Sequence, residues 1–137
     1  MRFSIASAIV VLALVAGVSS CTKDPETVPE GTVRLMINVN HHGFPIVNAV
    51  VFRKNGTLLF PGADTTLYDK RYVTDASGNL IISDVGNENK TMVLYAKGID
   101  PTWDTLILTP VSGYQFVNVT TAIGESKDFS ITIPVSE

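Results

Sequence analysis

The sequence predicts an all-β fold, a Greek-key sandwich of about seven or eight short strands. Three observations carry this prediction. From Thr32 onward, apolar residues alternate with polar ones in short windows, which is the period of a β-strand. Turn signals rich in Gly, Asn, Asp and Pro separate these windows. No window shows a sustained helical period bounded by capping residues.

The first element in order is a targeting segment, residues 1–20. Met1-Arg2 supplies a short positive start, and Phe3 to Val18 is an almost unbroken apolar run. This run is at the short end for a membrane span, and no basic stop-transfer residues follow it. We therefore expect a secretory signal peptide.

Cys21 follows this run and is the only cysteine of the chain, so it cannot form an internal disulfide. Val18-Ser19-Ser20-Cys21 resembles the lipobox of bacterial lipoproteins, in the looser form of the Bacteroidota. The resemblance implies cleavage before Cys21, a diacylglycerol on its sulfur and a fatty acid such as palmitate on the new amino terminus. It implies a lipid anchor in the cell envelope, expected in the outer membrane and facing the periplasm or the surface. The alternative is an ordinary signal peptide followed by a coincidental cysteine.

Removal of 20 of the 137 residues would leave 117, enough for one domain with its own core. Residues 21–31, with Pro25 and Pro29, predict an extended tether, and residues 32–137 the sandwich. Because Arg2 leaves with the signal, 9 of the 10 Lys and Arg remain against 13 Asp and Glu. A mildly acidic surface without a basic cluster argues against a nucleic-acid partner.

The first half of the domain is predicted from alternation and turn residues. The first strand starts at Thr32, with an inward set at Val33, Leu35, Ile37 and Val39, and ends at a turn, His41-His42-Gly43. The second strand, Ile46 to Lys54, has an inward set at Val47, Ala49 and Val51. Asn55-Gly56 predicts a type I′ hairpin turn, with Thr57 to Phe60 as the returning strand.

The second half of the domain is also predicted from alternation and turn residues. Strands are predicted at Leu67–Thr74, Asn79–Ser83, Thr91–Lys97, Asp104–Thr109, Tyr114–Thr121 and Lys127–Ile133. Loops or turns are predicted between them, at Gly98–Trp103 and Pro110–Gly113 among others. In Asp75-Ala-Ser-Gly78 the Asp side chain accepts local backbone N–H groups and Gly tolerates positive φ, which favours a type I turn.

Two motifs together resemble the carboxypeptidase regulatory-like, transthyretin-type (prealbumin-like) β-sandwich. They are Gly43-Phe-Pro-Ile-Val-Asn-Ala49-Val-Val51 and Thr74-Asp75-Ala-Ser-Gly78-Asn-Leu80-Ile-Ile82, followed by Val85-Gly86. The resemblance covers roughly residues 32–135 and implies the sandwich fold. The stretch Leu58 to Asp69 is longer than the usual linker, which leaves the edge strands unplaced.

No residue pattern predicts catalysis or a cofactor. His41 and His42 are neighbours on a strand end and point to opposite faces, so two exposed turn rings are favoured over a metal site. Asp64, Asp69, Asp75 and Asp84 lack the alternating spacing of a calcium loop. Asp64-Thr65-Thr66 and Asp104-Thr105-Leu106 resemble O-glycosylation acceptors of the Bacteroidota. No metal, cofactor or enzymatic activity is expected, and a hydrolase on this fold is a third alternative.

The outward parity of two strands holds apolar residues. If Val47, Ala49 and Val51 face the core, Val50 and Phe52 do not, and the same count places Val93 and Tyr95 outside. These four residues are the candidate partner surface. The alternative is that they lie beneath a cover formed by Leu58-Leu59-Phe60.

Two classes of function remain open from the sequence. One is a non-enzymatic, lipid-anchored module that docks on an envelope protein complex or a glycan. The other is a structural spacer or fimbria-type subunit in which a sheet edge accepts or donates a strand.

Overall fold

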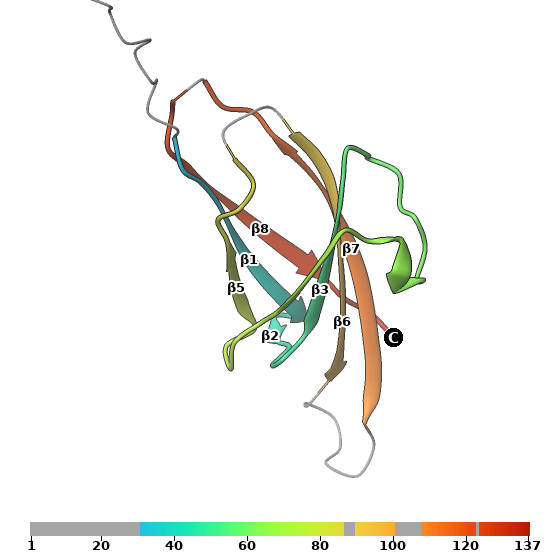
Figure 1. Cartoon of the computed structure of the whole chain (residues 1–137). Coiled ribbons are helices and arrows are strands. Elements are labelled where there is room, and N and C mark those ends of the chain that lie inside the picture. Colours follow the sequence, from blue (N-terminus) through green and yellow to red (C-terminus); the bar gives the residue numbers. More distant parts are fainter. Residues whose placement is uncertain (1–30, 87–89, 101–107, 123) are drawn as a thin grey trace, which may run out of the picture.

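The computed structural model describes residues 31–86, 90–100, 108–122 and 124–137, which form two sheets packed face to face (Figure 1). Sheet A contains β1 (Val33–His41), β2 (Phe44–Pro45), β5 (Asn79–Ile82) and β8 (Lys127–Pro134). Sheet B contains β3 (Val50–Asn55), β4 (Lys70–Val73), β6 (Lys90–Asp100) and β7 (Thr109–Val119). A short 3-10 helix, η1 (Thr65–Leu67), precedes β4. The predicted all-β sandwich is confirmed.

β1 is the central strand of sheet A. It pairs antiparallel with β5 and β2 along one edge and in parallel with β8 along the other. The first edge is marked by Val39, whose N–H donates to the Gly78 carbonyl and whose carbonyl accepts from Ile46. The second is marked by Asn40, whose carbonyl accepts from Val135. Sheet B is antiparallel throughout, in the order β4-β3-β6-β7.

The core lies between the two sheets and is apolar. The strand parities predicted for β1 and β6 are confirmed, because each residue of both inward sets is buried. On β8, Ile133 is buried, whereas Phe129 and Ile131 are half-buried against the same core. Strict alternation without an interrupting Gly or Pro makes these inward sets readable from sequence.

The turn Asp75–Gly78 forms as predicted and carries the chain from β4 in sheet B to β5 in sheet A. The Gly78 N–H donates to the Asp75 carbonyl at 3.1 Å, and the Asp75 carboxylate accepts from the N–H groups of Ser77 and Asn79. Gly78 has φ 71°, and a Cβ there would lie 2.9 Å from the Val39 carbonyl oxygen. Both its conformation and its close contact with β1 require glycine.

The predicted hairpin at Asn55-Gly56 is wrong. Gly56 has φ 75°, but Asn55 is not in the positive-φ region, and Thr57–Phe60 is not a strand. Two successive positive φ values, the type I′ signature, occur instead at His42 (49°) and Gly43 (87°), between β1 and β2. After β3 the chain runs through residues 56–69 and returns as β4, which pairs with β3.

The inward parity predicted before β3 is also wrong at one position. Asn48 adopts φ 54°, which breaks the alternation. Ile46 is therefore buried and Val47 exposed, and β3 begins at Val50. Ala49 and Val51 are buried as predicted.

The loop predicted at Gly98 and the turn predicted at Pro110–Gly113 lie in strands, since β6 continues to Asp100 and β7 begins at Thr109. Ser112 pairs its backbone with Ser136 on the edge away from β6, so Pro110, of the same parity, directs its missing N–H to that edge. Predictions for residues 1–30, including Cys21 and the tether, and for 101–107, including Asp104–Leu106, lie outside the described residues.

Candidate binding face on sheet B

The four residues of the predicted partner surface lie on the same face of sheet B, away from the core. Phe52 on β3 is directly opposite Tyr95 on β6 in the antiparallel register. Val50 shares the parity of Phe52 on β3, and Val93 shares that of Tyr95 on β6. The prediction that this parity points outward from the sandwich core is therefore correct.

The connection 56–69 covers part of this face and builds an aromatic cluster on it. The Tyr68 ring stacks on Tyr95 with centroids 5.7 Å apart and packs against Phe52 at 5.8 Å. The Phe60 ring packs on Tyr95 at 5.4 Å and stacks on Tyr114 of β7 at 4.3 Å, nearly coplanar at 11°. We call this cluster the aromatic face; it consists of Phe52, Phe60, Tyr68, Tyr95, Tyr114 and Phe116.

The exposed patch predicted from Val50, Phe52, Val93 and Tyr95 needs correction. Val93 is fully buried and Tyr95 is 4% exposed, while Val50 and Phe52 are half-buried. The cover anticipated from Leu58-Leu59-Phe60 comes from Phe60 together with Tyr68, whereas Leu58 and Leu59 remain exposed. These four residues therefore form the floor of a second, smaller apolar layer.

The accessible part of the aromatic face lies farther toward β7. Phe60, Tyr114 and Phe116 each expose a third or more of their surface, and Tyr114 and Phe116 meet edge to face at 5.4 Å. The sequence prediction did not include Phe116 in the surface. Phe116 has the same parity as Tyr114 within the predicted strand Tyr114–Thr121, so the alternation of that strand already contained the signal.

A cleft of about 480 Å³ adjoins the aromatic face at the β6–β7 end of the sheet. Its walls are mainly apolar, and Tyr95 forms part of its floor. The lining residues are Val47, Asn48, Val50, Tyr95, Lys97, Gly98, Ile99, Pro110, Val111 and Ser112. A second cleft of similar volume, beside Phe60 and Tyr114, shares Tyr95 and Ser112 with the first.

Tyr68 fixes the covering connection to the sheet. Its hydroxyl donates to the Gly62 carbonyl at 2.8 Å, which closes the loop on itself. Burial, and to a smaller extent the neighbouring Tyr95, raises the pKa of Tyr68 to about 12. The phenol is therefore neutral at physiological pH and acts as a hydrogen-bond donor.

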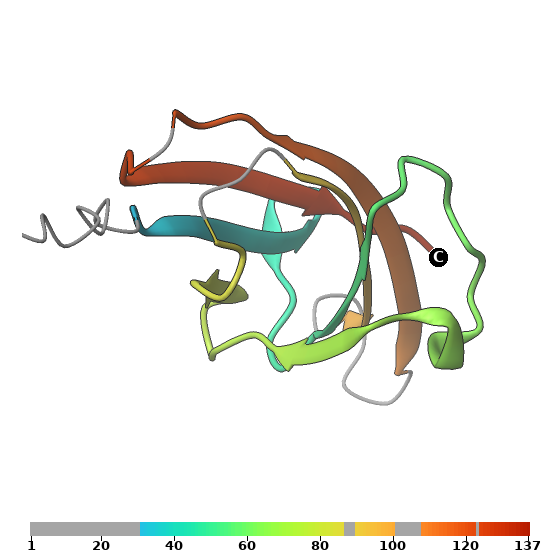
Figure 2. The same ribbon diagram turned by 45° about the horizontal axis from the view of Figure 1, so that its top comes forward.

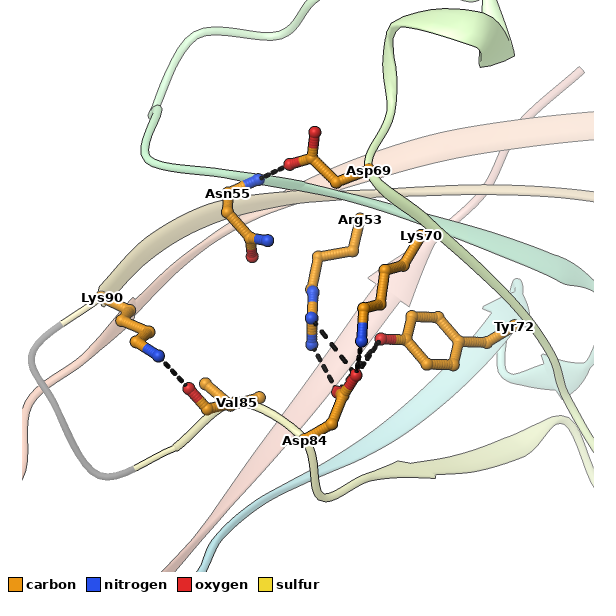
Figure 3. A network of polar contacts seen from close by, with 8 residues as sticks. All are labelled: Arg53, Asn55, Asp69, Lys70, Tyr72, Asp84, Val85 and Lys90. Carbon is orange, nitrogen blue, oxygen red and sulfur yellow. Dashed lines mark hydrogen bonds and ion pairs between the residues drawn. The ribbon is translucent and has the colours of Figure 1, made fainter.

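A polar network ties sheet B to the end of β5 (Figure 3). Asp84 accepts from the buried Arg53 at 2.7 Å, from Tyr72 at 3.1 Å and from Lys70. Burial raises the pKa of Asp84, but the hydrogen bonds from Lys70 and Arg53 outweigh it and hold the pKa at about 2. Burial raises the pKa of Tyr72 to about 12, so it donates to the carboxylate. The network is an ionic clasp between the sheets.

A second buried polar contact joins the ends of β1 and β6. His41 Nδ1 lies 2.6 Å from Asp100 Oδ2, and both side chains are buried. The prediction of two exposed histidine rings is therefore wrong for His41, while His42 is exposed. Within the described ranges, no group of three or more His, Cys, Asp or Glu could hold a metal ion.

No protein-family model matches this chain, and no curated protein matches it either. Among the residues that the structure describes, no helix is long and apolar enough to cross a membrane. The assignment of function therefore rests on the geometry of the aromatic face and its clefts.

Proposed function

We propose that this protein is a non-enzymatic binding module of the cell envelope, held by a lipid on Cys21, that docks through the aromatic face on an envelope protein complex or a glycan. The observation that carries the proposal is the half-exposed group Phe60, Tyr114 and Phe116, two of which, Phe60 and Tyr114, line a cleft together with Tyr95. Aromatic side chains with one accessible face are typical anchors of binding sites. The rings are held by neighbouring rings and lose little freedom on binding.

The docking site is tested by replacing both exposed rings of β7. Tyr114→Ser with Phe116→Ser is expected to leave the fold intact, since both side chains are largely outside the core. The double variant should also lose photo-cross-links in intact cells from a probe placed at Ala63, an exposed residue of the cleft that Phe60 and Tyr114 line. The matched control is Met36→Ser with Ile81→Ser, which removes two similarly exposed apolar side chains from sheet A. Equal loss in the control, or full cross-linking in the test variant, would contradict the proposed site.

The lipid anchor has a separate test. A clickable fatty acid fed to cells is expected to label the wild-type protein and to leave Cys21→Ser unlabelled, because the sulfur and the amino terminus at this residue are the proposed acyl sites. Fractionation should place the wild type with membranes, since two or more acyl chains anchor a protein stably. Labelling that persists in Cys21→Ser would remove the anchor from the proposal.

The second candidate function is a structural subunit that accepts or donates a strand. One observation favours it: the outward edge of β7 has a backbone partner at Ser112 but none along the rest of its described length, apart from the ladder with β6. This edge lies beside the aromatic face and is distinct from it.

A further inference from the structure

Beyond Ser112, the edge of β7 that faces away from β6 has no backbone partner among the residues that the structure describes. Ser112 exchanges both backbone hydrogen bonds with Ser136, at 2.8 and 3.0 Å, which identifies that edge. Backbone groups alternate sides along a strand, so those of Tyr114, Phe116 and Asn118 point the same way. In the part of the chain that the structure describes, the Phe116 carbonyl is met only by the side-chain amide of Gln115, at 3.5 Å.

β8 leaves β7 beyond the Ser112–Ser136 pair. A continued ladder would place Phe116 opposite Thr132 and Asn118 opposite Ser130. Instead a hollow of about 270 Å³ lies between the strands, lined by Gln115, Phe116, Val117 and Asn118 and by Phe129, Ser130, Ile131 and Thr132. We call it the β7–β8 hollow.

The second wall of the hollow also presents backbone groups that have no backbone partner in the described part of the chain. On β8, Lys127 and Val135 donate to β1, so the odd-numbered residues face β1. The alternation then turns the backbone groups of Ser130 and Thr132 toward the hollow. An extended strand placed there would find donors and acceptors on both sides.

Beyond Ser112, the β7 edge lacks the features that usually prevent strand addition, since its one proline, Pro110, lies before that residue. Natural edge strands are short, charged or interrupted by proline. β4, the other edge of sheet B, has four residues and carries Lys70 and Arg71. β7 has eleven residues and no charged one, and no charged side chain lines the β7–β8 hollow. The absence of charge therefore selects an uncharged strand as the occupant.

A segment with these properties is present on the chain itself. Thr57–Phe60 is uncharged, lies between Gly56 and Pro61, and has β-branched and apolar residues. Leu59 is 79% exposed, and its N–H donates to the Thr57 side chain at 2.9 Å. Among the described residues, no backbone hydrogen bond reaches Leu58 or Phe60. Figures 1 and 2 show the connection after β3 arching away from the strands.

We propose that Thr57–Phe60 of a second copy of this chain adds to β7 as an extended strand in the β7–β8 hollow. Leu59 would then face Phe129 and Ile131, the half-buried apolar side chains of the hollow. The inference rests on the second candidate function, strand addition. It shares Phe60 and Phe116 with the aromatic face, so its test uses Leu59 and Asn118, which are not members of that face. Because donor and acceptor are different surfaces, the contact is head-to-tail and extends into chains of subunits.

The test uses the full chain in detergent and measures its association by sedimentation velocity over a range of concentrations. The wild type is expected to form dimers and longer species. Leu59→Asp removes the donor by charging it, and Asn118→Pro removes an N–H of the acceptor edge without touching the ladder with β6. Each variant alone is expected to lose the species larger than a monomer.

Mixing the two variants supplies the decisive result. One retains the donor and the other the acceptor, so an equimolar mixture is expected to restore a heterodimer and no longer species. Asn118→Lys serves as the acceptor variant if the proline variant does not fold, and Ile81→Asp on sheet A is the matched control that should associate like the wild type.

Three results would overturn the proposal. A wild-type protein that stays monomeric at all concentrations would exclude a second copy as the source of the added strand. Association that survives Leu59→Asp would indicate symmetric pairing of β7 edges. Two monomeric variants that do not complement one another would separate the association from this donor and acceptor. None of these results bears on cross-linking through the aromatic face.

Discussion

Gly113→Ala is expected to lower the free energy of unfolding by about 3 kcal/mol, from the lost burial of one valine and two lost hydrogen bonds. A Cβ at position 113 would lie 2.0 Å from the Pro134 carbonyl oxygen and 3.0 Å from the Val135 Cα. The tail after β8 would have to move away from β7. Val135 would then leave the core, and the backbone pair between Ser112 and Ser136 would break.

The sign of the expected change in unfolding free energy tests the packing of the tail after β8. A glycine replaced by alanine where the backbone conformation is ordinary usually stabilises a protein by roughly 0.4–1 kcal/mol. Gly113 is not among the positive-φ glycines, so the loss must come from the close approach of the tail. Urea unfolding measures it, with Ser112→Ala as the neighbouring control that keeps the backbone pair. A free energy equal to or above that of the wild type would contradict the packing of the tail.

Asp84→Ala is expected to lower the free energy of unfolding by about 2–3 kcal/mol, because it leaves the guanidinium of Arg53 buried without its carboxylate. The Arg53 side chain is 4% exposed, whereas Asp84 is 39% exposed, which places the estimate at the low end for broken ion pairs. Arg53 Nε is already buried with no hydrogen-bond partner among the described residues.

A rescue variant separates charge burial from lost packing. Arg53→Met in the Asp84→Ala background removes the unpaired charge and keeps an apolar stem, so most of the lost stability should return. Thermal unfolding of the two single variants and the double variant gives the coupling energy. A double variant no more stable than Asp84→Ala would mean that the ionic clasp does not depend on neutralising Arg53.

The same carboxylate predicts an acid-sensitive range. The pKa of Asp84 is about 2 in the folded protein, below its ordinary value, so its contribution is full above about pH 5. The contribution is lost as pH falls from about 4 to about 2. In Asp84→Asn, the loss of unfolding free energy that this carboxylate causes between about pH 4 and pH 2 should be absent. A weaker pH dependence of stability should remain. The backbone N–H of Asn55 and then the Lys54 side chain lower the pKa of Asp69, and Arg34 lowers the pKa of Asp128.

Alternation predicted the inward residues correctly where no residue interrupts the strand. β1 alternates along its length, and the core residues of β6 alternate from Met92 to Ala96, so the inward residues of these stretches follow from the sequence. The errors fall where one residue carries a constraint from elsewhere. Asn48 reverses the parity before β3 through its positive φ. Gly113 was taken for a turn residue, although its role is to admit the tail after β8.

Of the candidate site, only the residues beneath the covering rings could be predicted from the sequence. The outward parity of Phe52 and Tyr95 followed from local alternation, but their cover depends on the path of residues 56–69, which no local signal gives. Phe60 and Tyr114 meet across more than fifty positions of sequence. The contact between His41 and Asp100 joins residues 59 positions apart, and no local sequence pattern indicates it.

The position of β1 has a mechanical consequence. A pull on the amino-terminal side of the chain, as from an anchor at Cys21, would act along the axis of β1. This strand is paired on both edges, by eight residue pairs with β8 and four with β5. Its hydrogen bonds run across the direction of the pull, so they are sheared together and none is peeled off singly. The first strand after the proposed anchor is therefore the one best placed to bear tension.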